Sequence, residues 1–279
     1  VTASAGLFAL TYGFNEAASN GWASAKTLTF FISSAVLLTL FFVIESKVKN
    51  PMLPLRVLED RNRAGSYLGS LSIGAGLFSM FLFLGLFFQV VLQYSPLRSG
   101  FAFLPFTAGI IGGAGISSNL LPKTGPKPLM IPGLLVSASG LLWLARLTPT
   151  SEYLTHVVPS LVLMSVGMAF VFIPLMTTAL HNVNHHDTGV ASAMINTSQQ
   201  IGGSLGTALL NTVAATAATN YIASHTEMGQ TVKLFAMVHG FDSAFKVGAA
   251  LLIVGAIVLF TSINVGKDSV VESDAVVMH

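Results

Sequence analysis

Uncharged polar side chains recur at helical spacing within one segment of the chain. The positions on this face, separated by four, three, four and four residues, are Asn196, Gln200, Gly203, Thr207 and Asn211, and all but Gly203 have a polar side chain. At about 100° per residue they share one face of an α-helix. Such a face supplies hydrogen-bond donors and acceptors without charge, which suits the wall of a water-filled cavity or substrate path. Hydrogen bonding between packed helices is the alternative interpretation.

Glycines are concentrated in the same segment and in one other apolar run. Gly202 and Gly206 form a small-xxx-small pair with Gly203 beside them, and the other run contains Gly109 and Gly113. The missing side chains let another helix approach closely. Each glycine also weakens a helix by about 1 kcal/mol relative to alanine. We therefore expect helix packing at these positions, with bending during a conformational change as the alternative.

Phenylalanines cluster near the end of the apolar run 65–88. Phe83 and Phe87 are four residues apart and therefore share a helix face. An aromatic face of this kind could form an apolar wall for greasy aromatic compounds. The default interpretation is that these rings face lipid.

The composition excludes several classes of function. Charged residues make up 9% of the chain and hydrophobic residues 53%, whereas a soluble domain has about 25% charged residues. The net charge of +2 gives no reason to expect a nucleic-acid partner. The chain has no cysteine, which rules out disulfides, thiol catalysis and thiolate metal sites.

The sequence contains no motif of an enzyme active site. It lacks a glycine-rich phosphate loop, a His-Glu-x-x-His pair and a nucleophile elbow. His181 and His185, with His186 beside them, have a spacing that could share a metal, but no third ligand on a rigid element accompanies them. We therefore expect no enzyme activity, no cofactor and no metal site.

Eight apolar runs determine the expected fold. They cover about residues 1–16, 27–45, 65–88, 99–121, 129–147, 157–180, 188–218 and 241–263. A helix of about 20 residues crosses a bilayer core, and isolated strands would leave backbone groups without hydrogen bonds in lipid. The sequence therefore predicts an all-α membrane protein with about eight transmembrane helices.

The polar segments between the runs predict the orientation and the domains. Eight lysines and arginines fall on the side that receives the C-terminus, against five on the other, so the C-terminal side is expected to be cytoplasmic. The expected domains are two extra transmembrane helices in 1–46, the first truncated, a cytoplasmic amphipathic connection over 47–64, a six-helix bundle over 65–264 and a cytoplasmic tail over 265–279. Because Val1 already lies inside an apolar run, we expect a fragment of a longer protein.

Three segments, 45–56, 92–105 and 189–206, carry a resemblance to a known family. On these segments the chain resembles the C-terminal part of the fourteen-helix drug:proton antiporters of the major facilitator superfamily. The resemblance implies the second bundle of a major facilitator fold plus two extra linker helices, with alternating access around a central cavity. It also implies a location in the bacterial inner membrane. The implied partners are the lipid bilayer, a missing N-terminal helical bundle of the same protein, protons and small lipophilic substrates.

The resemblance implies that this chain is part of a proton-coupled secondary-active exporter of lipophilic drugs or toxic compounds. The expected substrate path combines a polar wall, Asn196, Gln199, Gln200, Thr207 and Asn211, with an apolar wall, Phe83 and Phe87. A dedicated exporter of one metabolite or antibiotic and a non-transporting membrane module are the alternatives.

Carboxylates are expected only near the ends of the apolar runs. Glu16 and Glu45 end two runs, and Asp242 lies near the expected start of the last run. Lys246, one turn later, is the expected ion-pair partner of Asp242. Because proton-driven transport requires an ionisable group within the membrane, we expect the proton-coupling residue to lie outside this chain.

Overall fold

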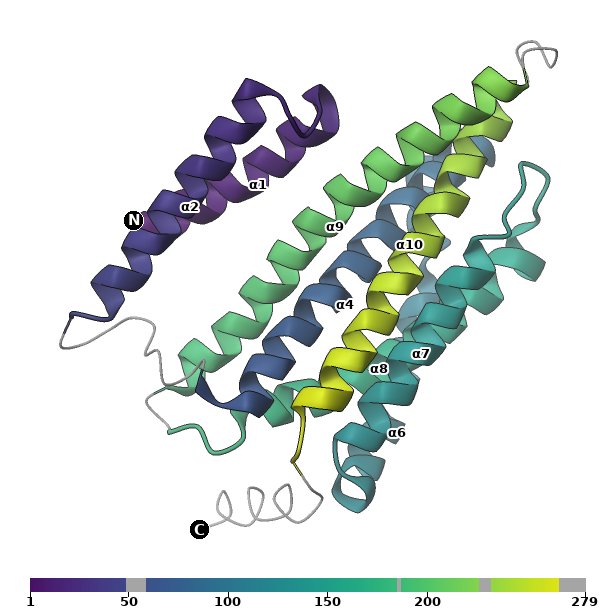
Figure 1. The fold of residues 1–279 in the computed structure, drawn as a ribbon. Coiled ribbons are helices and arrows are strands. Elements are labelled where there is room, and N and C mark those ends of the chain that lie inside the picture. The colour runs from purple at the N-terminus through teal and green to yellow at the C-terminus, as the bar shows by residue number, and fades with distance from the viewer. Residues whose placement is uncertain (49–58, 185–186, 226–231, 266–279) are drawn as a thin grey trace.

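The computed structural model describes residues 1–48, 59–184, 187–225 and 232–265, and every regular element in these ranges is a helix (Figure 1). In chain order the elements are α1 (Thr2–Asn20), α2 (Ala25–Glu45), α4 (Arg61–Leu86), η1 (Phe87–Val91), α5 (Pro96–Phe101), α6 (Leu104–Thr124), α7 (Lys127–Leu144), η2 (Tyr153–Val157), α8 (Val158–Leu180), α9 (Thr188–Ser224) and α10 (Val232–Ser262), where η denotes a π-helical turn. The predicted all-α fold is confirmed.

All eight predicted apolar runs coincide with helices. Within the described residues, six helical segments are long and apolar enough to cross a membrane: α2, α4 with η1, α5 with α6, α7, η2 with α8, and α10. α1 and α9 are not among these six. α9 has 37 residues, but its amides, hydroxyls and glycines lower its hydropathy. The helix that carries the polar stripe is therefore poorly suited to contact lipid on all sides.

α4 begins four residues earlier than predicted. The Asp60 carboxylate accepts a hydrogen bond of 2.9 Å from the backbone N–H of Arg63, as a helix N-cap does. Arg61 and Arg63 therefore belong to the first turn of α4 and not to the predicted connection over 47–64. Most of that connection lies outside the described residues, as does the predicted tail from residue 266 onwards.

α10 begins at Val232, nine residues before the predicted run. Lys233 and His239 interrupt the apolar pattern there, which concealed the first turns of the helix. Asp242 therefore lies ten residues inside α10, and its predicted position near a helix start is wrong. The predicted ion pair is confirmed, because Lys246 Nζ lies 2.9 Å from Asp242 Oδ2.

The helices form a hairpin, α1 with α2, beside a bundle of the remaining helices (Figure 1). Within the hairpin, the ring centroids of Phe14 and Phe31 are 4.9 Å apart. The Ser34 hydroxyl donates a buried hydrogen bond of 2.9 Å to the carbonyl oxygen of Gly6. α1 lies along α9, so the hairpin meets the bundle at the helix that carries the polar stripe.

Aromatic rings help to join α4 to α10 inside the bundle. The ring centroid of Phe83 is 5.5 Å from that of Phe241 and 6.1 Å from that of Phe245. All three rings are buried in the main hydrophobic core together with Phe87. α4 and α10 therefore share one apolar interface, while another face of α4 packs against α9.

The first and last helices of the bundle are also joined at their ends. Arg61 donates from Nη2 to the carbonyl oxygen of Thr261 at 2.6 Å. The side-chain oxygen of Asn62 accepts a hydrogen bond of 2.7 Å from the backbone N–H of Asn264. The start of α4 and the end of α10 therefore meet at one corner of the bundle.

Candidate functional site

Close packing of α9 on α4 sets the position of the polar stripe. A Cβ atom at Gly202 would overlap the backbone carbonyl of Leu71. A Cβ atom at Gly206 would lie 2.5 Å from the Cα atom of Ala75. Backbone therefore touches backbone along this seam, as small residues permit between membrane helices.

The other predicted glycines also lie at helix contacts. A Cβ atom at Gly203 would lie 2.6 Å from a ring carbon of Phe78 on α4. On α6, Gly109 and Gly113 both face α8, and a Cβ atom at Gly113 would lie 2.7 Å from that of Ala169. The geometry at all five glycines fits helix packing, and bending at these positions stays a prediction.

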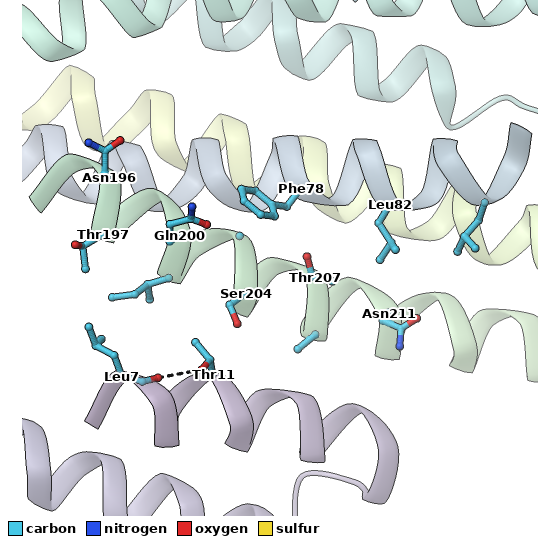
Figure 2. Close-up of a pocket in the computed structure, with 14 residues that line it drawn as sticks. Leu7, Thr11, Phe78, Leu82, Asn196, Thr197, Gln200, Ser204, Thr207 and Asn211 are labelled. Carbon is cyan, nitrogen blue, oxygen red and sulfur yellow. Dashed lines mark hydrogen bonds between the residues drawn. The ribbon is translucent and has the colours of Figure 1, made fainter. Parts of the chain in front are cut away.

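A cavity of about 860 Å³, here called the central cavity, lies beside the seam between α4 and α9 (Figure 2). From α9 it is lined by all five positions of the stripe, Asn196, Gln200, Gly203, Thr207 and Asn211. α4 contributes Phe78, Leu82 and Leu86, and α1 contributes Leu7 and Thr11. The structure therefore brings the predicted stripe together on one wall, with apolar side chains beside it and α1 opposite (Figure 2).

The polar groups of this wall do not join helices together. Within the part of the chain that the structure describes, the side chains of Gln200, Thr207 and Asn211 form no hydrogen bond. The Asn196 amide donates only within its own helix, to the carbonyl oxygen of Ser192 at 3.1 Å. Threonine hydroxyls elsewhere on α9 bond to the carbonyl one turn back. The stripe therefore keeps donors and acceptors available to whatever fills the cavity.

Gln199 lies outside the central cavity, although it was predicted to share a wall with Gln200. It lines a separate cavity of about 140 Å³ between α4, α8 and α9, together with Ser70 and Phe172. One residue along a helix is a rotation of about 100°, which takes this side chain off the stripe. Asn196 borders both cavities, so the two cavities meet at that residue.

The apolar side of the central cavity is formed by residues other than the predicted ones. Phe83 and Phe87 are 1% and 0% exposed and belong to the bundle core. Neither lines the central cavity, but Phe83 also lines a smaller cavity toward the end of α9. Phe78 is 42% exposed and lines the central cavity in their place, with Leu82 and Leu86. These three residues recur every four positions on α4, a spacing that could have identified them in the sequence.

Two further cavities adjoin the central cavity along α9. The proximal cavity, of about 820 Å³, lies between the start of α9 and the hairpin, includes Glu45, and shares Leu7 and Thr197 with the central cavity. The distal cavity, of about 280 Å³, lies toward the end of α9 and shares Leu86 and Asn211 with the central cavity. Among the described residues, no charged side chain lines the central cavity. The three cavities therefore form a series with an uncharged middle.

The histidine-containing turn before α9 is only partly described. His185 and His186 lie outside the described residues, and Asp187 occupies the N-cap position of α9. Across 1–48, 59–184, 187–225 and 232–265, no group of three or more metal-binding side chains is present.

Helices of membrane-spanning length around a cavity lined by uncharged polar and apolar groups are typical of membrane transporters. The sequence model of the Major Facilitator Superfamily matches residues 2–207. The chain therefore belongs to this superfamily and is part of a multi-pass membrane protein.

Two relatives indicate which members of the superfamily the chain is similar to. The puromycin resistance protein of Streptomyces alboniger is 38% identical over 263 residues, which cover 93% of this chain and 52% of that protein. The cephamycin export protein of Amycolatopsis lactamdurans is 32% identical over 215 residues, which cover 76% of this chain and 44% of that protein. The chain spans about half the length of the curated relatives it matches.

A solved structure agrees with the arrangement of the helices. The bacterial homologue of the human lysosomal transporter Spinster, in an inward-facing and unoccupied conformation, has a TM-score of 0.57. The alignment covers 98% of this chain and 69% of that chain at 14% sequence identity. At this identity the likeness concerns the fold alone.

Proposed function

We propose that this chain forms the second bundle and two linker helices of a proton-coupled exporter of lipophilic drugs or other toxic compounds. The observation that carries the proposal is the central cavity, in which hydrogen-bonding groups without partners face apolar side chains. A resistance protein and an export protein among its relatives support the same function. The function is transport, with no chemical conversion of the substrate.

The cavity suits lipophilic substrates for a physical reason. A fixed charge would bind one class of ion and penalise neutral compounds, whereas the uncharged wall penalises neither. The amides of Gln200 and Asn211 and the hydroxyl of Thr207 can each donate or accept a hydrogen bond. Phe78 and Leu82 supply apolar contact on the other side. Such a wall adapts to substrates that differ in the position of their polar groups.

The remaining parts of the mechanism belong to the complete protein. An N-terminal bundle would complete the cavity on the side that this chain leaves open, and rocking of the two bundles would give alternating access. The central cavity contains no carboxylate among the described residues, which supports a proton-coupling group on the N-terminal bundle. The excess of basic residues on the C-terminal side supports a cytoplasmic C-terminus in a bacterial inner membrane.

The proposal is tested by ethidium efflux from cells that express the complete reading frame containing this chain. Efflux should stop when a protonophore collapses the proton gradient. A protein that is inserted and folded, yet exports neither ethidium nor other lipophilic dyes, would contradict broad drug export. Export of a single host antibiotic in that case would identify a dedicated exporter, in line with the name of the cephamycin relative.

The cavity wall is tested separately at position 200. Gln200→Ala should change the relative rates for different substrates by about fivefold, the equivalent of one hydrogen bond of ~1 kcal/mol, without reducing insertion. Gln200→Cys should react with a membrane-impermeant thiol reagent because this position lines the central cavity, and these 279 residues contain no other cysteine. Ala191→Cys, on the same helix but fully buried, is the matched control that should stay unlabelled. Equal labelling of both variants would contradict a water-filled path along the stripe.

A further inference from the structure

The distal cavity differs from the central cavity in its charge. It lies between α4, α9 and α10, and its walls are mostly alanine and large apolar side chains. Only two of its described lining residues are polar, Asn211 and Lys233. Asn211 also borders the central cavity, so a molecule that extends from the central cavity past Asn211 reaches the ammonium group of Lys233.

Within the described residues, no neighbour neutralises the positive charge of Lys233. Among the described residues Lys233 has no ion-pair or hydrogen-bond partner. The carboxylate of Asp242 is nine residues away on the same helix, about 180° around the axis, and it pairs with Lys246 at 2.9 Å. The ion pair therefore lies on the face of α10 that points away from the distal cavity. Among the described residues that line it, the distal cavity therefore has one positively charged side chain and no negatively charged one.

Lys233 can reach a ligand without a rearrangement of the helix. Its side chain is exposed, in the first turn of α10, and the long aliphatic part of a lysine can follow an apolar wall while the ammonium group stays solvated. Asn211, at the junction of the two cavities, is the other polar side chain among the described residues that line the distal cavity. Apolar walls lower the local dielectric constant and strengthen a contact between Lys233 and an anion.

We propose that the distal cavity is an anion-binding subsite in which Lys233 recognises a carboxylate on an otherwise lipophilic substrate. Lys233 is then a specificity-determining residue: it favours substrates that carry a carboxylate and disfavours those whose only charge is positive. The inference rests on the proposed export function and names a substrate class within it. The central cavity binds the uncharged body of the substrate, and the distal cavity binds the carboxylate at one end.

A matched pair of dyes isolates this charge. Rhodamine 110 carries a free carboxylate, and rhodamine 123 is its methyl ester, so the two differ by that group alone. In cells that express the complete protein, Lys233→Gln should slow the efflux of rhodamine 110 by about tenfold, the loss of a charge-assisted hydrogen bond. It should not slow rhodamine 123, because it removes a repulsion from that cation. Lys233→Glu should reverse the order and make rhodamine 123 the faster substrate.

The control variant is Lys246→Gln, which removes the same charge from the opposite face of the same helix. It should leave the ratio of the two efflux rates as in the wild type. An equal effect of Lys233→Gln on both dyes, or a shift of the ratio by Lys246→Gln as large as that by Lys233→Gln, would overturn the proposal. Size-exclusion profiles of the detergent-solubilised variants confirm that all are folded.

A binding measurement separates the subsite from the export function. If the wild type exports neither dye, the proposed function fails for these compounds, and fluorescence anisotropy with the purified complete protein decides on the subsite. Tighter binding of rhodamine 110 than of rhodamine 123, lost in Lys233→Gln, supports the subsite without transport. Equal affinities for the two dyes in the wild type would refute it.

Discussion

α8 and α9 follow each other in the sequence and belong to the same bundle, yet they differ in hydropathy and in what their faces contact. α8 is apolar enough to cross a membrane, and it packs closely against α7 and α6. α9 is longer but is not among the helices apolar enough to cross a membrane on composition alone. One face of α9 packs on α4 through glycines, and another presents the polar stripe to the central cavity.

The difference shows what a polar stripe requires of its surroundings. Unpaired amides are costly in hydrocarbon, so a helix that carries them must face other protein or water. α9 meets this requirement because α4 covers one side and α1 lies opposite the stripe. α8 has no such stripe and is stabilised by packing. A helix that departs from the apolar pattern is therefore the better guide to the functional surface.

The largest effect is expected from a substitution at the contact between α9 and α4, behind the polar stripe. In Gly202→Val the new side chain would meet the backbone of Leu71, which cannot move aside as a flexible side chain can. The cost should exceed the ~1–3 kcal/mol of ordinary overpacking and separate α9 from α4. Fluorescence-detected size-exclusion chromatography should show aggregated protein. Gly189→Ala, on the same helix with nothing within 4 Å, should elute like the wild type.

A second test contrasts two phenylalanines of α4. Phe83→Ala removes a buried ring that contacts Phe241 and Phe245, and a loss at the lower end of ~3–5 kcal/mol is expected. Phe78→Ala truncates a ring that is 42% exposed in the central cavity. Its melting temperature should stay near that of the wild type while its substrate profile changes. A larger loss of stability in Phe78→Ala than in Phe83→Ala would show that core and cavity have been assigned the wrong way round.

The smallest effect is expected where α7 meets α8. The Ser137 hydroxyl shares its one proton between the carbonyl oxygen of Gly133, at 2.9 Å, and that of Met164 on α8, at 3.3 Å. Hydrogen bonds between membrane helices contribute ~0.6 kcal/mol on average, so Ser137→Ala should lower the melting temperature only slightly. Transport rates should be unchanged, because this interface lies away from the central cavity. A changed substrate profile would mean that α8 takes part in substrate recognition.

The periodicity of α9 was sufficient to predict the central wall. All five stripe positions line one cavity because a straight helix preserves the angle between residues four apart. Gln199 was misassigned because residues adjacent in the sequence point in different directions on a helix. The prediction of the stripe thus depended only on the local geometry of one helix, which the sequence specifies well.

The apolar wall could not be chosen from the sequence in the same way. α4 is apolar on several faces, because it packs against both α9 and α10, and hydropathy does not distinguish a ring in the core from a ring in a cavity. Phe78 faces α9 and the central cavity, whereas Phe83 faces α10 in the core and borders the distal cavity. The early start of α10 was missed because Lys233 and His239 interrupt the apolar run, and Lys233 proved to line the distal cavity.

The contacts of Arg61 and Asn62 with the end of α10 bring the entry and exit of the bundle's chain to the same corner. A chain whose ends already meet can be reconnected there with a short linker at little entropic cost. The bundle is thus suited to circular permutation, with residue 264 joined to residue 61 and new termini in the connection between α9 and α10. In such a permuted bundle the helices would be synthesised in a different order but would pack against the same neighbours.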